Sequence, residues 1–347
     1  MSKLTRNEFA KQFQRFIDKY DRFLLSGHIR PDGDSIGVCY SLGYALEQMG
    51  KEVLVCLDGN ADRYLKLIRP LPLLPEDAEM RDASRYFKTG KTFAFIMLDC
   101  SEPERTGRAA DAILYASASL TIDHHVTSKE AADFNYTEPE SSSTCELLYH
   151  LMKLCSIPVN REIATALYMG VSFDTGGLRH SNTSADTYQM AADLKQLGVD
   201  TTYLTNQLFH TKSMTEMKAL SAAIRSSKIY HGLSRDGEKN DILISYLSQV
   251  EMTRCGFSAQ DADGVVGYLN EIEDAETAVF LREIGPEQIR ANMRSKSVVD
   301  VARVASLFGG GGHVRAAGCT FQDPPLLVKQ KLLEAIHLQL RDLQEEA

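Results

Sequence analysis

The stretch GHIRPDGDSIG, residues 27–37, decides the fold of the first half of the chain. It lies between a short apolar run, typical of a β-strand, and the helical spacing of residues 35–49, which Gly50 closes. Further apolar runs recur downstream, with amphipathic or polar segments between them. The four runs are residues 22–26, 52–57, 93–98 and 120–122. This alternation predicts an α/β fold built on a parallel sheet.

The composition is that of an ordinary globular protein: 347 residues, 44% hydrophobic and 24% charged. A formal net charge of −9 opposes binding to long duplex DNA, but it allows a small anionic substrate beside metal ions. The longest apolar stretch, residues 93–98, is too short to cross a bilayer, so no membrane partner is expected. The polar N-terminus and seven scattered cysteines without a CxxC pair indicate a cytoplasmic protein with reduced thiols.

The second half is also α/β in character. Residues 142–196 have a mostly helical pattern, and residues 201–227 contain neither glycine nor proline, which favours a helical linker over a flexible tether. Strands are then expected at 241–246, 277–282 and 288–293, and helices at 258–272, 298–308 and 326–343. The predicted organisation is a first domain at residues 1–200, a helical linker at 201–227 and a smaller α/β domain at 228–347.

Acidic and histidine side chains recur at the ends of the apolar runs. They are His28, Asp32 and Asp34 after the first run, Asp99 after the third, and Asp123, His124 and His125 at the fourth. The carboxyl ends of parallel strands share one edge of a sheet, where open α/β sheets bind their ligands. We therefore expect these side chains to converge.

Each motif also has a plainer interpretation. Asp34 could be only the N-cap of its helix, and Asp174, in GVSFDTGG at residues 170–177, could be only a turn residue. Recurrence at four places favours a metal site instead. Carboxylates and imidazoles together form a mixed oxygen and nitrogen donor set that suits Mn²⁺, with more donors than one ion needs. Two ions are therefore predicted.

These motifs resemble, in order, the four motifs of the DHH phosphoesterase superfamily. They read HIRPDGDSIG at residues 28–37, LDCSEPER at 98–105, DHH at 123–125 and DTGG at 174–177. In the second half, GGGGHVRAAG at residues 309–318 is similar to the glycine-rich signature of the DHHA1 domain, and Arg-Ser-Lys at 294–296 is similar to that domain's Arg-Ser element. The layout resembles that of the NrnA-type bifunctional oligoribonucleases and 3′-phosphoadenosine 5′-phosphate (pAp) phosphatases.

The resemblance assigns a role to each acidic or histidine residue. Asp99 would bridge two Mn²⁺ ions, with Mg²⁺ or another divalent ion as an alternative. The remaining ligands would be His28 and Asp32 on one ion, and Asp34, His124 and Asp174 on the other. His125 would orient the phosphate or assist proton transfer, and Asp123 would fix an imidazole. The sequence leaves open whether His124 or His125 is the metal ligand.

The second domain is expected to bind substrate. The residues implied are Arg294, Ser295, Gly310, Gly311, Gly312, His313 and Arg315. Backbone N–H groups of consecutive glycines can approach an anion closely, and His313 adds a donor. The alternatives are a flexible hinge for the glycines and a surface charge for Arg315. A ligand held by both motif sets would lie in a cleft between the two domains.

The resemblance implies a hydrolase that degrades short oligoribonucleotides (nanoRNA) to mononucleotides and removes the 3′-phosphate of pAp. Its partners would be short RNA and pAp-type nucleotides, and it would form a homodimer. The alternatives are hydrolysis of the linear dinucleotide pApA or of cyclic-di-AMP, and a nucleotide sensor without catalytic activity.

Overall fold

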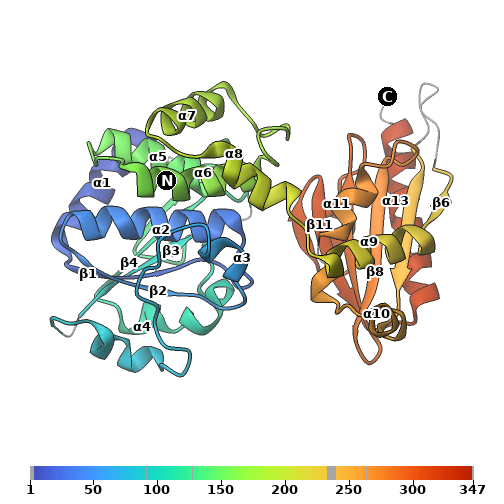
Figure 1. Ribbon diagram of the computed structural model, residues 1–347, viewed down its shortest axis with the longest axis horizontal. Coiled ribbons are helices and arrows are strands. Elements are labelled where there is room, and N and C mark those ends of the chain that lie inside the picture. Colours follow the sequence, from blue (N-terminus) through green and yellow to red (C-terminus); the bar gives the residue numbers. More distant parts are fainter. Residues whose placement is uncertain (1–3, 91, 127, 233–239, 263, 346–347) are drawn as a thin grey trace. The chain divides into compact units, whose positions relative to one another are not determined.

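The computed structural model describes residues 4–90, 92–126, 128–232, 240–262 and 264–345 (Figure 1). The chain folds as two compact units, with the division between Thr211 and Lys212. Each unit combines helices with one β-sheet, which confirms the predicted α/β fold in two domains. Among the described helices, none has both the length and the apolar composition that a membrane span requires.

The sheet of the first unit is fully parallel, as predicted, with the strand order β2-β1-β3-β4-β5. Its strands are β1 (Arg22–Ser26), β2 (Glu52–Cys56), β3 (Ala94–Leu98), β4 (Ala118–Asp123) and β5 (Phe134–Thr137). The chain runs from β1 to β2 on one side and then returns to β3 on the other side of β1. The order of the strands therefore reverses between β1 and β3, which is where ligand sites form in open α/β sheets.

Helices cover both faces of this sheet (Figure 1, blue to green). They are α1 (Arg6–Lys19), α2 (Gly33–Gln48), α3 (Asp62–Leu65), η1 (Met80–Tyr86), η2 (Pro103–Ala109), α4 (Ala112–Tyr115), α5 (Thr144–Leu154), α6 (Arg161–Asp174), α7 (Ala185–Gln196), α8 (Thr201–Thr205) and the π-helical turn η3 (Asn206–His210). The larger core packs α1, α2, α5 and α6 against one face, and η1, η2 and α4 pack against the other. Burial on both faces explains why the strands are almost continuously apolar.

Helices α2 and α6 pack unusually closely at two glycines. A Cβ atom on Gly37 would lie 2.7 Å from the carbonyl oxygen of Ala166, and one on Gly170 would lie 2.7 Å from Oδ1 of Asp34. Real Cβ atoms do not approach other atoms so closely, so only glycine fits at either position. The close approach brings the C-terminal end of α6 beside the N-terminal end of α2.

The second unit has a mixed six-stranded sheet with the order β10-β11-β9-β8-β7-β6. The strands are β6 (Lys228–Tyr230), β7 (Ile242–Leu247), β8 (Thr277–Gly285), β9 (Gln288–Ser295), β10 (Gly311–His313) and β11 (Ala316–Phe321). The helices are α9 (Met214–Ser226), α10 (Gln249–Cys255), η4 (Gln260–Ala262), α11 (Val265–Asn270), α12 (Val301–Ser306) and α13 (Pro325–Glu345). One core contains residues of α9, α10 and α11, and a separate core contains residues of α12 and α13.

Several elements differ from the sequence predictions. Residues 201–227 are largely helical but not continuous, since α8, η3 and α9 follow one another and α9 belongs to the second unit. The helix expected at 258–272 shortens to η4 and α11. Strands β5, β6, β10 and β11 were not predicted. In β10 and β11 the glycine and alanine residues have low strand propensity, and the pairing of β11 with β9 and of β10 with β11 sets the conformation instead.

The close contact of α2 with α6 predicts how one added methyl group at Gly37 changes the stability of the protein. Replacing Gly37 with alanine should lower the free energy of unfolding by about 1–3 kcal/mol, because the overpacked Cβ outweighs the gain in helix propensity. Gly267 in α11 is the matched control: a Cβ added there would have no atom within 4 Å, so Gly267→Ala should be neutral or stabilising. Urea unfolding measures both changes, and equal stability of Gly37→Ala and the wild type would disprove the steric contact.

Candidate metal centre

The acidic and histidine motifs converge at the carboxyl edge of the first sheet. His28 follows β1, Asp99 follows β3 and Asp123 ends β4, and these three strands are neighbours. Asp174 arrives from a different direction, as the last residue of α6. The predicted convergence of the four motifs is therefore present in the structure.

Three overlapping groups of side chains have ligand atoms that all lie within 4.8 Å of one another. They are His28, Asp32 and Asp99; Asp34, His124 and Asp174; and Asp99, His124 and His125. Asp99 belongs to two of these groups, and His124 also belongs to two. These overlapping groups make one continuous cluster that could hold more than one metal ion.

Asp99 lies at the centre of this cluster and is 2% exposed. Its Oδ2 atom is 3.3 Å from Nε2 of His28, and its Oδ1 atom is 3.7 Å from Nε2 of His124. Oδ1 also accepts a hydrogen bond of 3.0 Å from the hydroxyl of Thr144. The φ angle of Asp99 is 61°, a left-handed conformation that a non-glycine residue holds only when its surroundings require it.

Asp32 and Asp34 have different structural roles. Asp32 is the N-cap of α2, because its Oδ1 atom accepts hydrogen bonds from the backbone N–H groups of Asp34 and Ser35. Its other oxygen, Oδ2, lies 3.5 Å from Nε2 of His28. The interpretation of Asp34 as the N-cap is therefore wrong, and Asp34 is instead a fully inward-facing side chain of the first helical turn.

The N-terminus of α5 is a part of the site that the sequence analysis missed. The backbone N–H groups of Thr144 and Cys145 donate hydrogen bonds of 2.7 and 3.0 Å to the two oxygens of Asp34. A helix N-terminus stabilises a carboxylate in this position. The signal in the sequence was the run Ser-Ser-Ser-Thr at 141–144, in which Ser143 is the N-cap.

His124 and His125 face different partners, although they are adjacent. Nε2 of His124 lies 3.3 Å from Oδ2 of Asp174, and its Nδ1 atom is 3.3 Å from the carbonyl oxygen of Ser141. Nδ1 of His125 lies 2.7 Å from Oδ1 of Asp123, whose other oxygen accepts a hydrogen bond from the hydroxyl of Ser128. Asp123 therefore orients the imidazole of His125, whereas His124 faces Asp174.

In the second unit most of the predicted substrate residues lie on β9 and β10, with β11 between these strands, while Gly310 precedes β10 and Arg315 lies in the turn between β10 and β11. The register pairs Arg294 of β9 with Ala316 of β11, and Ala316 with His313 of β10. Residues that are paired in this way have side chains on the same face of a sheet, so Arg294 and His313 flank a small alanine. Two residues along β9, Asn292 pairs with Gly318, which continues the floor of small residues.

Arg294 is a partly buried cation, and burial lowers the pKa of its guanidinium. Its hydrogen bond is to the carbonyl oxygen of Met293, and within the described part of the chain no carboxylate forms an ion pair with it. A desolvated cation without an acidic partner is typical of an anion site. Arg315 and Ser295 differ, because both bind the carbonyl oxygen of Val299 and so hold the loop after β9.

Comparison with known families supports both halves of this description. The model of the DHH family N-terminal domain matches residues 22–171, and the model of the DHHA1 domain matches residues 239–342. The chain belongs to the DHH–DHHA1 family.

Relatives of this DHH–DHHA1 chain cover nearly its full length. The bifunctional oligoribonuclease and PAP phosphatase NrnA of Thermus thermophilus is 29% identical over 321 residues, which span 91% of this chain and 89% of that protein. The Bacillus subtilis protein of the same name is 27% identical over 311 residues, spanning 88% and 91%. The crystal structure of an exopolyphosphatase-related protein from Bacteroides fragilis superposes with a TM-score of 0.84 at 22% identity and covers 96% and 97%. At that identity the superposition shows the shared fold.

The pKa shifts within the cluster of acidic and histidine side chains are those of a site suited to divalent cations. Burial raises the pKa of Asp174 to about 6, against the opposing effect of His124. Burial, together with the charges of Asp174 and Asp99, raises the pKa of Asp34 well above its usual range. Burial alone would lower the pKa of His124, but Asp174, Asp99 and Asp34 outweigh it and raise that pKa to about 10. The cluster therefore concentrates negative charge that protons or metal ions must balance.

These pKa shifts predict how metal binding depends on pH. A raised pKa means that the metal-free site holds its proton more tightly. Above pH 6.5 a divalent ion bound there would displace the proton of His124, whereas Asp174, with a pKa of about 6, is by then mostly ionised. The affinity for Mn²⁺ should therefore rise between pH 6.5 and 8.5, by about tenfold per pH unit for each proton displaced. Titration calorimetry in buffers of different ionisation enthalpy measures the released protons.

A matched pair of variants controls this measurement. His124→Gln should weaken Mn²⁺ binding and remove most of its pH dependence, whereas His337→Gln, which changes a histidine of α13, should leave both unchanged. Wild-type binding that is independent of pH and releases no protons would contradict a role of His124 as a ligand.

Proposed function

We propose that this chain is a metal-dependent phosphoesterase that hydrolyses short oligoribonucleotides to mononucleotides and removes the 3′-phosphate of pAp. The observation that carries this proposal is the shared position of Asp99, whose two oxygens face His28 on one side and His124 on the other. The relatives named NrnA, which carry both activities in their names, support the choice of substrate class.

The proposed cofactors are two Mn²⁺ ions. The mixed carboxylate and imidazole donors fit this ion, and the overlapping groups fit a pair. Asp99 would be shared, with His28 and Asp32 on one side and Asp34, His124 and Asp174 on the other. When bound, such a pair lowers the pKa of water and neutralises charge on the phosphate.

The protein's own side chains would position and protonate the substrate. Asp123 holds the imidazole of His125 through Nδ1, which fixes the ring orientation, and His125 would orient the phosphate or assist proton transfer to the leaving oxygen. The positive end of α5, bound to Asp34, favours the ionised form of that carboxylate and holds it in place.

The second unit would bind a phosphate of the nucleotide substrate. Arg294 supplies the cation, and His313 supplies a further donor across Ala316. Gly310 and Gly312 allow β10 to lie against β11, since a Cβ on either glycine would collide with the backbone of β11. The anion would rest on a floor formed by Ala316 and Gly318. The seven free thiols fit the reducing cytoplasm as the location.

The first activity test concerns Asp99. Asp99→Ala should reduce turnover of pAp and of a 5′-labelled trinucleotide by about a thousandfold or more, because a shared ligand serves both ions. The control is Asp111→Ala, which changes an exposed aspartate without a capping hydrogen bond and should retain full activity. Release of mononucleotide with added Mn²⁺ is the measurement.

The outcomes separate the proposed function from its alternatives. Near-normal activity of Asp99→Ala would contradict the metal assignment. Wild-type protein that binds pAp but releases no product would indicate a nucleotide sensor. Comparison of the rates on pAp, pApA, cyclic-di-AMP and a short RNA identifies the preferred substrate, and a marked preference for pApA or cyclic-di-AMP would replace the proposed one.

The second activity test concerns Arg294. Arg294→Gln should raise KM for pAp by about ten- to a hundredfold, with a smaller change in kcat, because it removes a charge-assisted hydrogen bond to the ligand. Arg303→Gln in α12 is the matched control and should leave KM unchanged. A loss of kcat at constant KM would place Arg294 in the chemical step instead.

A further inference from the structure

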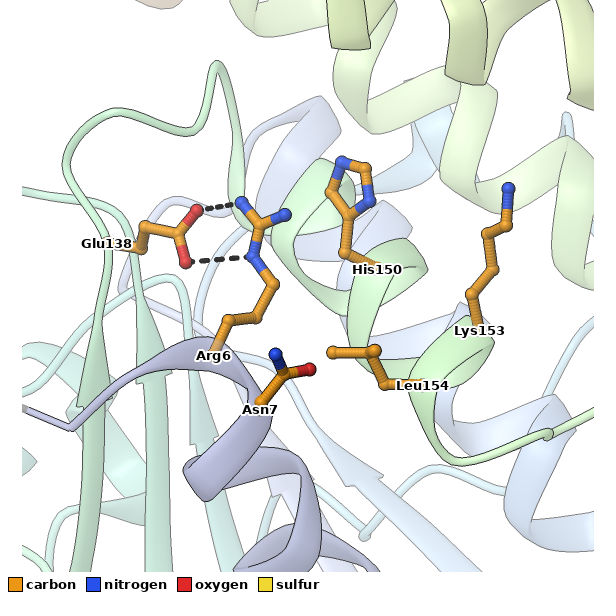
Figure 2. Close-up of a pocket in the computed structure, with 6 residues that line it drawn as sticks. All are labelled: Arg6, Asn7, Glu138, His150, Lys153 and Leu154. Atoms are coloured by element: carbon orange, nitrogen blue, oxygen red, sulfur yellow. Dashed lines mark hydrogen bonds and ion pairs between the residues drawn. The ribbon is translucent and has the colours of Figure 1, made fainter.

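A cavity of about 520 Å³ lies between α1, α5 and the segment after β5, outside the residues of the metal cluster. Six residues line it: Arg6, Asn7, Glu138, His150, Lys153 and Leu154. Figure 2 shows Arg6 and Glu138 joined on one side, with His150 and Lys153 on the other. Its volume is within the range of small-molecule sites in proteins.

The lining is basic in a protein of formal charge −9. Arg6 and Lys153 are permanent cations and His150 adds an imidazole, whereas Glu138 is the one acidic residue among the six. The charge of Glu138 is offset by its ion pair with Arg6. Glu138 accepts from Arg6, from the hydroxyl of Tyr136 at 2.5 Å and from the hydroxyl of Ser141 at 3.0 Å.

The other two basic residues, Lys153 and His150, have acidic neighbours that are not among the six lining residues. Both of these acids also accept hydrogen bonds from other groups. Asp193 accepts a hydrogen bond of 3.2 Å from Lys153, but it also accepts from the hydroxyl of Tyr149 at 2.5 Å. Glu146 lies 3.7 Å from Nε2 of His150, beyond hydrogen-bond range, and accepts from Ser142 and Thr187. Arg6 and Lys153 thus each have a carboxylate neighbour, so the affinity for an anion must come from the N–H donors that these contacts leave unused.

Hydrogen-bond donors remain available on the cavity wall. Arg6 uses Nε and Nη2 for Glu138, which leaves its other terminal nitrogen, and Lys153 has further N–H groups beyond the one directed at Asp193. Asn7 makes no side-chain hydrogen bond to any residue that the structure describes. Leu154, which is 47% exposed, supplies an apolar surface beside these donors.

We propose that this cavity is a second ligand site, which binds a small phosphorylated anion up to the size of a nucleoside monophosphate. The phosphate would lie between Arg6 and Lys153 with Asn7 as a further donor, because paired cations and an amide match the oxygens of a phosphate group. Leu154 would contact the apolar part of a larger ligand. The proposal does not depend on the phosphoesterase function, since none of the six residues belongs to the metal cluster.

The site is nevertheless connected to that cluster through Glu138. The backbone N–H of Glu138 donates to the carbonyl oxygen of Asp123, and its side chain accepts from Ser141, whose carbonyl oxygen lies 3.3 Å from Nδ1 of His124. A ligand that draws Arg6 away from Glu138 would therefore act on residues that position two members of the DHH triplet.

The test measures binding without metal or turnover. Inorganic phosphate and AMP are titrated calorimetrically into the full chain in the presence of a chelator, with Arg294→Gln as the background so that the second unit contributes little. Lys153→Gln, at a half-exposed position that should tolerate the change, should weaken both ligands by at least about tenfold. Arg6→Gln should do the same, while Arg15→Gln, an exposed position on the same helix, should have no effect.

Leu154→Ala distinguishes the two probes, because it should weaken the binding of AMP but leave the binding of inorganic phosphate unchanged. The proposal would be overturned if neither inorganic phosphate nor AMP bound in the Arg294→Gln background. It would also be overturned if Lys153→Gln and Arg15→Gln bound these ligands with equal affinity. Circular dichroism shows whether Arg6→Gln still folds, and if it does not, the result for Lys153→Gln decides. Because no turnover is measured, an inactive enzyme would not affect the outcome.

Discussion

The repulsion among buried carboxylates at one edge of the first sheet is the constraint on which the rest of the structure depends. Asp99, Asp34 and Asp123 are almost fully buried, and Asp174 stands beside them. Four acids so close together are unfavourable unless cations or imidazoles balance them. The strand order, the left-handed backbone at Asp99 and the close contact of α2 with α6 all act to hold these acids together against that repulsion.

Two helix ends have opposite electrostatic effects on two carboxylates of the cluster, Asp34 and Asp174. The N-terminus of α5 donates two hydrogen bonds to Asp34 and stabilises its negative charge. Asp174 lies at the C-terminus of α6, where the helix dipole disfavours a carboxylate and favours a cation. His124 compensates Asp174 in the metal-free site, and a divalent ion would replace the proton that His124 carries. The geometry thus favours binding of metal over binding of protons as the pH rises.

The sequence predicted the parallel sheet and the convergence of its motifs, because both follow from apolar runs that end in Asp or His at the carboxyl edge of neighbouring strands. It could not separate His124 from His125, since adjacent residues differ only in the partners that the fold brings to them. The role of the α5 N-terminus was hidden because Thr144 and Cys145 bind Asp34 through their backbone N–H groups. The row of Arg294, Ala316 and His313 depends on strand register, which glycine-rich strands leave unspecified in sequence. The assigned metal and substrate roles stay predictions.

The sharing of one buried aspartate, Asp99, between two metal ions is the feature on which the proposed chemistry rests. Anomalous scattering recorded at the manganese absorption edge from crystals grown with Mn²⁺ tests this sharing directly. We expect two peaks about 3.5–4 Å apart, each within bonding distance of an Asp99 oxygen, whether the two ions bind different oxygens or the same one. A single peak distant from Asp99, or two peaks that share no ligand, would contradict it.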